Sequence, residues 1–145
     1  IGSAIQASDA TDSQGFFTEY GLEQAIKNII HDELNLSAEN YQFSLRDNII
    51  AFYRDWVEMG KPQLLFYVNC LLNAEQLRDL VEKRKRKTDK EVLFIPVDDL
   101  QTATITADLI VINTIGSKKK YYKVFPSTSA SIYMYFYNLD MEEKV

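Results

Sequence analysis

The spacing of apolar residues from Phe16 onward is that of an amphipathic helix. Large apolar side chains recur at intervals of three and four residues, which places them on one face of a helix. These residues are Phe17, Tyr20, Leu22, Ile26, Ile29, Ile30 and Leu34. The pattern predicts a first helix that ends near Asn35. The small, polar residues 1–15 precede it, and we expect them to form a flexible linker.

A second helix is predicted over residues 44–59. Ser44, followed three residues later by Asp47, resembles a capping box, and Gly60 is suited to ending a helix. The apolar positions between these signals are Leu45, Ile49, Phe52, Tyr53 and Trp56. Their spacing again fits one helical face, so the pattern predicts that this face is buried.

The same segment has a competing interpretation, in which Tyr41–Leu45 and Ile49–Tyr53 pair as a hairpin. We favour the helix because the helical spacing continues over several turns. In that interpretation Trp56 belongs to the core, where its large side chain would be shielded from water.

A strand–helix–strand unit is predicted in the middle of the chain. Leu64–Val68 and Val92–Val97 are apolar runs of strand length. Between them, Asn73 can cap a helix that extends to about Lys87. Two strands joined by such a helix form a parallel pair with a right-handed crossover, so the pattern predicts a βαβ unit. Pro96 cannot donate to a strand ladder and should lie at an edge or at the strand's end.

Beyond Asp99 the pattern is that of β-strands alone. Leu109–Ile115 and Tyr121–Phe125 are strand-like runs on either side of a turn, and Ile132–Tyr137 alternates strictly between two faces. We expect these three runs to form a C-terminal β-meander.

These elements together predict an α/β or α+β fold with two N-terminal helices, a βαβ unit and the β-meander. The mixed sheet should have about four or five strands. With 145 residues, of which 46% are hydrophobic, the chain fits one globular domain. We place this domain at residues 16–139 and expect a frayed tail at 140–145.

Cysteine content and hydropathy limit the class of protein. Cys70 is the single cysteine, so the sequence contains no internal disulfide and no Cys-x-x-Cys motif. This fits a reducing compartment, and we expect a cytoplasmic location. No apolar run approaches the roughly 18–20 residues that a membrane span requires. Because the sequence begins at Ile1 rather than Met, we expect a piece of a longer protein, so a preceding domain, anchor or signal stays open.

Charge is distributed unevenly along the chain, whose formal net charge is −5. Ten of the sixteen Lys and Arg residues fall into two short runs. The runs are Lys83, Arg84, Lys85, Arg86, Lys87 and Lys90, and Lys118, Lys119, Lys120 and Lys123. Cations at a helix C-terminus or a hairpin tip commonly serve stability and solubility. Five consecutive cations exceed that need, and Tyr121 and Tyr122 are suited to stacking on bases. The runs therefore predict a polyanion site, with nucleic acid as the main candidate.

The topology decides whether the two runs meet. If Leu109–Ile115 is antiparallel to Val92–Val97, both runs lie at the same end of the sheet. An additional strand within Gln101–Thr106 would place them at opposite ends. We favour the shared end because the connection at 98–108 is short and contains no convincing long helix.

Two adjacent carboxylates, Asp98 and Asp99, follow the second predicted parallel strand. The carboxyl ends of parallel strands often form ligand sites, and these aspartates could hold a divalent cation with Asn69. That would suit a metal-dependent phosphoesterase or nuclease. In the competing interpretation, one aspartate caps a helical turn and the other is solvated. With His31 as the only histidine and no phosphate-binding glycine motif, the sequence assigns no catalytic residue, and we expect no cofactor.

The last predicted strand carries Tyr133, Tyr135 and Tyr137 on one face. Tyrosine is common on the outer face of half-buried strands, and it is also enriched at protein interfaces. Because so few groups are suited to catalysis, we favour a non-enzymatic interaction domain that binds a protein partner or the remainder of a larger chain. Polyanion binding is the first alternative, and metal-dependent hydrolysis is the second.

Overall fold

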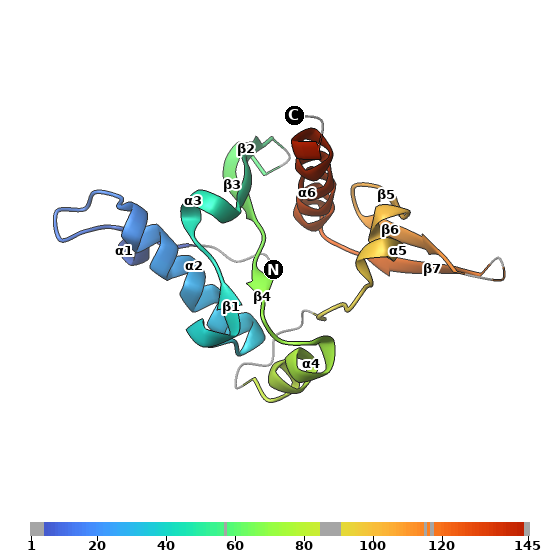
Figure 1. The fold of residues 1–145 in the computed structure, drawn as a ribbon. Helices are drawn as coiled ribbons and strands as arrows, with labels where there is room; N and C mark the ends of the chain where they lie inside the picture. The colour runs from blue at the N-terminus through green and yellow to red at the C-terminus, as the bar shows by residue number, and fades with distance from the viewer. Residues whose placement is uncertain (1–4, 57, 85–90, 115, 117, 144–145) are drawn as a thin grey trace. The chain divides into compact units, whose positions relative to one another are not determined.

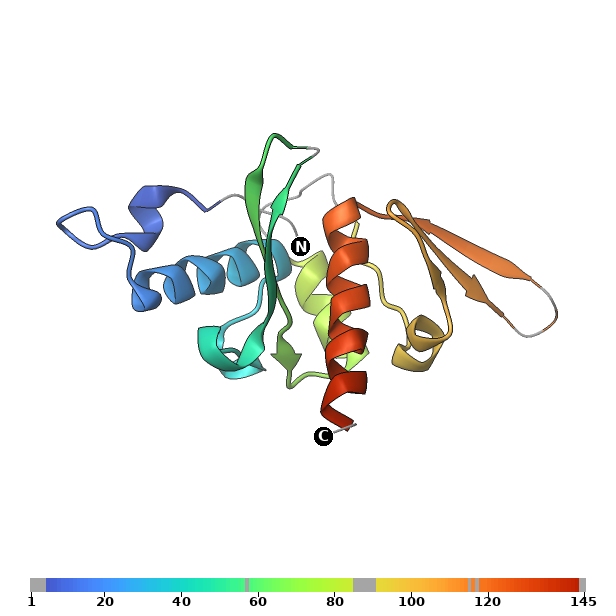
Figure 2. The same cartoon turned by 90° about the horizontal axis from the view of Figure 1, so that it is seen from above.

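A computed structural model gives the fold of this protein, and it describes residues 5–56, 58–84, 91–114, 116 and 118–143. Helices combine with small antiparallel sheets, so the predicted mixed α/β class is confirmed. Contacts between residues divide the chain into two compact units (Figure 1; Figure 2). The first is Ile1–Asn48 with Val68–Leu93, and the second is Ile49–Tyr67 with Phe94–Val145. A single domain over residues 16–139 stays a prediction.

The first unit is built around helix α2 (Glu19–Leu34), which confirms the first predicted helix. Thr18 caps its start, because the Thr18 hydroxyl accepts a hydrogen bond from the Gly21 N–H at 2.9 Å. Asn35, in the left-handed conformation, ends it. Ile26 and the neighbouring apolar residues of its inner face are buried. Helix α1 (Ala7–Ala10) lies in the segment predicted as a linker, and its Ala10 is fully buried.

Helix α4 (Ala74–Glu82) packs against α2. Asn73 caps α4 as predicted, in a reciprocal capping box with Gln76. The Asn35 amide donates to the Leu80 carbonyl oxygen at 3.1 Å and ties the end of α2 to α4. α4 ends earlier than predicted, and residues 85–90 lie outside the described part of the chain.

Short elements complete the first unit: η1 (Ala38–Asn40), β1 (Tyr41–Gln42), α3 (Leu45–Asn48) and β4 (Asn69–Cys70), with β1 antiparallel to β4. Glu23 of α2 joins two of the helices. Its carboxylate accepts hydrogen bonds from the Lys27 ammonium at 2.6 Å and from the Leu45 N–H at 3.0 Å. Both bonds favour the ionised form, and they lower the pKa of the Glu23 carboxyl.

The second unit begins with a hairpin of β2 (Ile49–Asp55) and β3 (Lys61–Phe66), so the predicted helix over 44–59 is wrong beyond α3. The alternative hairpin is wrong as well, because β1 pairs with β4. Strand β2 is rich in β-branched and aromatic residues, which favour extended backbone. Met59 and Gly60, with φ of 55° and 78°, turn the hairpin instead of ending a helix.

The predicted βαβ unit is also wrong, because every strand pair among the described residues is antiparallel. Leu64 lies in β3 beside β2, and residues 92–96 are not a strand. Helix α5 (Val97–Gln101) begins directly after Pro96. A hairpin closes a shorter loop than a helical crossover, so it loses less chain entropy. The prediction of a metal site placed Asn69, Asp98 and Asp99 at the carboxyl ends of two neighbouring parallel strands. That parallel pair is not formed, so this reason for placing the three residues together is lost.

A three-stranded antiparallel sheet follows, with β5 (Thr104–Ile105), β6 (Leu109–Asn113) and β7 (Lys119–Lys123) in that order. The predicted hairpin between 109 and 125 is confirmed. Strand β5 is the additional strand within Gln101–Thr106 that we disfavoured. The two basic runs belong to different units, so whether they share a face stays a prediction.

The last element is helix α6 (Pro126–Glu143), which replaces the predicted strand Ile132–Tyr137. Pro126 at the first helical position favours a helix start, since proline lacks the N–H that would be unpaired there. Within its unit, α6 lies between the β2–β3 hairpin and the three-stranded sheet (Figure 1; Figure 2). α6 contacts both strands of the hairpin, so packing against β2 and β3, rather than the strand-like alternation, decides that this segment is a helix. α6 also includes residues 140–143 of the predicted tail.

Candidate functional site

Three of the four lysines of the second basic run, Lys119, Lys120 and Lys123, lie on β7, at the edge of the three-stranded sheet. Successive strand residues face opposite sides, so Lys119, Tyr121 and Lys123 share one face. Tyr121 is 62% exposed between these two lysines. Tyr122, paired with the buried Ile110, is on the other face and half-buried. The structure thus brings together three of the predicted polyanion-binding residues, which we call the β7 face, and it separates Tyr122 from them.

The other cationic residues of the predicted polyanion site do not belong to the β7 face. Lys83 is exposed, whereas the Arg84 guanidinium donates to the Glu33 carbonyl oxygen at 3.1 Å. Lys118 and Lys120 are exposed. Four further members of the first run lie outside the described residues, and they are Lys85, Arg86, Lys87 and Lys90.

The predicted tyrosine face is not formed, because helix α6 distributes its residues differently from a strand. Residues four apart share a helical face, and Tyr133 and Tyr137 stack with ring centroids 6.4 Å apart. Tyr135 is half-buried, with its ring centroid 5.2 Å from that of Tyr67. A protein interface at the two exposed tyrosines stays a prediction.

The β2–β3 hairpin carries an unexpected set of exposed apolar side chains. Trp56 is 81% exposed and Met59 is 98% exposed, both in the turn, and Phe52 on β2 is 67% exposed. The prediction that Trp56 belongs to the core is therefore wrong. We call Phe52, Trp56 and Met59 the hairpin patch. The sequence signal for this hairpin turn was the Met59-Gly60 pair between two apolar runs. Gly60 was instead predicted to end a helix.

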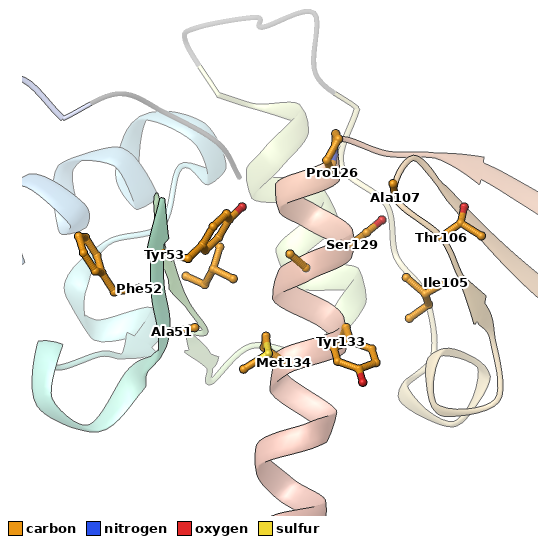
Figure 3. A pocket seen from close by; sticks show the side chains of 12 residues that line it. Ala51, Phe52, Tyr53, Ile105, Thr106, Ala107, Pro126, Ser129, Tyr133 and Met134 are labelled. Carbon is orange, nitrogen blue, oxygen red and sulfur yellow. The ribbon is translucent and has the colours of Figure 1, made fainter. Parts of the chain in front are cut away.

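An apolar pocket of about 620 Å³ lies within the second unit (Figure 3). One wall is a single face of α6, whose pocket residues follow helical spacing: Pro126, Ser129, Ala130, Tyr133 and Met134. The hairpin supplies a second wall that includes Tyr53, and β5 with the turn after it supplies a third that includes Ile105. The small side chains of Ser129 and Ala130 leave room that a larger residue would fill.

Two polar groups adjoin this pocket. The Ser129 side chain is on the side of α6 that faces Ile105 and Ala107 (Figure 3). Its hydroxyl oxygen is buried and has no hydrogen-bond partner. Burial raises the pKa of the Tyr53 phenol, and the carboxylates of Asp55 and Glu58 raise it further. The Tyr53 hydroxyl is therefore protonated at neutral and mildly alkaline pH.

Asp98 and Asp99 lie in the first turn of α5. The Thr102 hydroxyl donates to their backbone carbonyl oxygens, at 3.2 and 3.4 Å. Within the described ranges, no group of three or more His, Cys, Asp and Glu side chains could hold a metal ion. A metal site at the two aspartates stays a prediction.

Comparison with protein families, with curated proteins and with solved structures gives no match for this chain. In the part of the chain that the structure describes, no helix combines the length and apolar character needed to cross a bilayer. Any functional conclusion therefore depends on the chemistry of the surfaces and of the pocket.

Proposed function

We propose that this chain is a non-enzymatic interaction domain of a larger protein or assembly, and that it contacts a protein partner through the hairpin patch. The observation that carries the proposal is the 81% exposure of Trp56. Single exposed apolar side chains are normal on protein surfaces, whereas several on one element mark an interaction site, and Phe52 and Met59 are exposed on the same hairpin as Trp56.

The composition of the hairpin patch supports this proposal. Trp, Phe and Met are enriched at the centres of protein interfaces. Trp56 and Met59 project from a turn, where they can enter a concave surface with little rearrangement of the strands. We therefore expect the partner to offer an apolar cavity that receives the Trp56 indole.

A photo-crosslinking amino acid at position 59, next to Trp56, tests this proposal in cells, with the same probe at position 97 as control. Val97 is a suitable control position because it is exposed and apolar and lies in the same unit. The purified partner should then bind the domain and shift the emission of Trp56 to shorter wavelength, since Trp56 is the single tryptophan.

Trp56→Ala should weaken this binding by at least about thirtyfold, or about 2 kcal/mol, as expected for an interface hot spot. Val97→Ala should change the affinity by less than about twofold. Equal crosslinking at positions 59 and 97, or an unchanged affinity of Trp56→Ala, would refute the proposed surface.

The β7 face favours a second function, binding of single-stranded nucleic acid. Two lysines on either side of an exposed tyrosine on one strand face combine phosphate contacts with a stacking platform. Tyr121→Ala should weaken binding by roughly 1–3 kcal/mol without changing the salt dependence, whereas Tyr121→Phe should keep the affinity. Lys119→Ser with Lys123→Ser should flatten the logarithmic salt slope by about 0.7 per lost contact. Absence of binding to single strands at about 50 mM salt would end this hypothesis.

A further inference from the structure

We propose that the pocket between α6, the β2–β3 hairpin and β5 binds a small, uncharged, largely apolar molecule with one hydrogen-bond acceptor, such as a ketone, and that the Ser129 hydroxyl donates to that acceptor. This site shares Phe52 with the hairpin patch but includes neither Trp56 nor Met59, and it shares no residue with the β7 face. Its volume of about 620 Å³ is in the range typical of small-molecule sites.

The first argument concerns Ser129. This residue is only 5% exposed, lines the pocket and has no hydrogen-bond partner for its hydroxyl oxygen. Serines in helices commonly donate to the carbonyl oxygen four residues earlier, and Ser131 does so to Ser127 at 2.9 Å. Ser129 does not, although it occupies the same helix. A buried hydroxyl without a partner is costly. The Ser129 oxygen is closed to water-sized groups in the rotamer shown, so rotation of the side chain toward the pocket is the step that lets it donate to an acceptor on a bound molecule and removes that cost.

The second argument concerns charge. None of the pocket's lining residues is Lys, Arg, His, Asp or Glu. An ionised ligand would lose its hydration without gaining a counter-ion, which is strongly unfavourable. The carboxylates that raise the pKa of Tyr53 also place negative potential beside the hairpin wall. These features favour a neutral ligand over a carboxylate or a phosphate.

The third argument concerns orientation. The Ser129 side chain is on the β5 side of α6, whereas Met134 is on the hairpin side (Figure 3). An acceptor bound at Ser129 therefore places the apolar part of the ligand across Ala130 and Met134. Methionine adapts to irregular apolar shapes and makes favourable contacts with aromatic rings, so an aryl ketone suits this wall.

A matched set of three probes tests the proposal: 4-phenylbutan-2-one, n-butylbenzene and 4-phenylbutanoate. They share an aromatic ring and a short chain, and they differ in offering a neutral acceptor, no acceptor or a charged one. Binding is followed by the chemical shifts of backbone amides in α6. The ketone should bind with a dissociation constant on the order of 1 mM, as expected for so small a ligand, and more tightly than the other two.

Ser129→Ala should weaken binding of the ketone about five- to tenfold and leave n-butylbenzene unaffected. Ser131→Ala is the matched control and should bind all three probes like the unchanged protein. Ser129→Ala should also raise the melting temperature, because it removes an unpartnered buried hydroxyl. A lower melting temperature would show that the hydroxyl has a partner inside the protein, and would overturn the proposal.

Ala130→Phe fills the pocket and should abolish binding of the ketone while the circular dichroism spectrum is retained. Chemical shifts that persist in this variant would place the ligand elsewhere, and equal binding of ketone and hydrocarbon would show that Ser129 is not used. Either result overturns the proposal. None of these outcomes depends on Trp56, so the pocket and the hairpin patch are tested independently.

Discussion

Replacing Trp56 by alanine should lower the free energy of unfolding by less than about 1 kcal/mol. Truncation of a fully buried tryptophan costs about 3–5 kcal/mol. Trp56 is 81% exposed, so about a fifth of its surface is removed from water, and the cost scales to about 0.6–1 kcal/mol. The same substitution in a helix packed on a core, as the apolar spacing predicted, would cost the full amount.

Urea unfolding followed by circular dichroism measures this difference, since the variant has lost the only tryptophan. Leu65→Ala is the control for buried apolar area, because Leu65 lies on the partner strand β3 and is only 5% exposed. This control should cost about 2–5 kcal/mol. A loss above about 3 kcal/mol for Trp56→Ala would refute the exposed hairpin patch, and so would equal losses for the two variants. The unfolding curves also test the single-domain prediction, since two independent units would give two transitions.

Two further predictions concern the first unit. Glu23→Gln should destabilise the protein by about 1–2 kcal/mol at neutral pH, because it removes the charge that Lys27 and the Leu45 N–H stabilise. Because folding lowers the pKa of Glu23, its stabilising contribution is complete above the pKa that Glu23 has in the unfolded chain. The contribution is lost as the pH falls through the pKa of Glu23 in the folded protein. The free energies of unfolding of the unchanged protein and of Glu23→Gln should therefore converge in acid. Gly21→Ala should detach α1, since the new Cβ would lie 2.7 Å from the Ala10 carbonyl oxygen; amide hydrogen exchange near Ala10 should accelerate. A net stabilisation near the roughly 1 kcal/mol that alanine gains over glycine in a free helix would contradict that contact.

The sequence by itself determined the elements whose signals are local. The spacing of Ile26 with its neighbours specifies α2, and the Asn73 box specifies the start of α4, because caps and helical faces depend on residues within a few positions. The β6–β7 hairpin is equally local, since its strands are joined by a short turn. The alternation of Lys119, Tyr121 and Lys123 along β7 follows from the period of a strand, once the strand is identified.

Tertiary structure decided the elements whose apolar patterns fit two periods. Residues 49–55 and 132–137 are apolar at positions that suit either a helix or a strand, and the partner decides between them. Residues 49–55 pair with β3 and form strand β2. Residues 132–137 belong to helix α6, which packs against the β2–β3 hairpin. The exposure of Trp56 and the pocket at Ser129 depend on which faces these elements cover. The pocket depends on contacts between residues far apart in the chain, because α6 contacts the β2–β3 hairpin, so it could not be inferred from local spacing. The β2–β3 hairpin is itself local, and its signal at Met59 and Gly60 was assigned to the end of a helix instead.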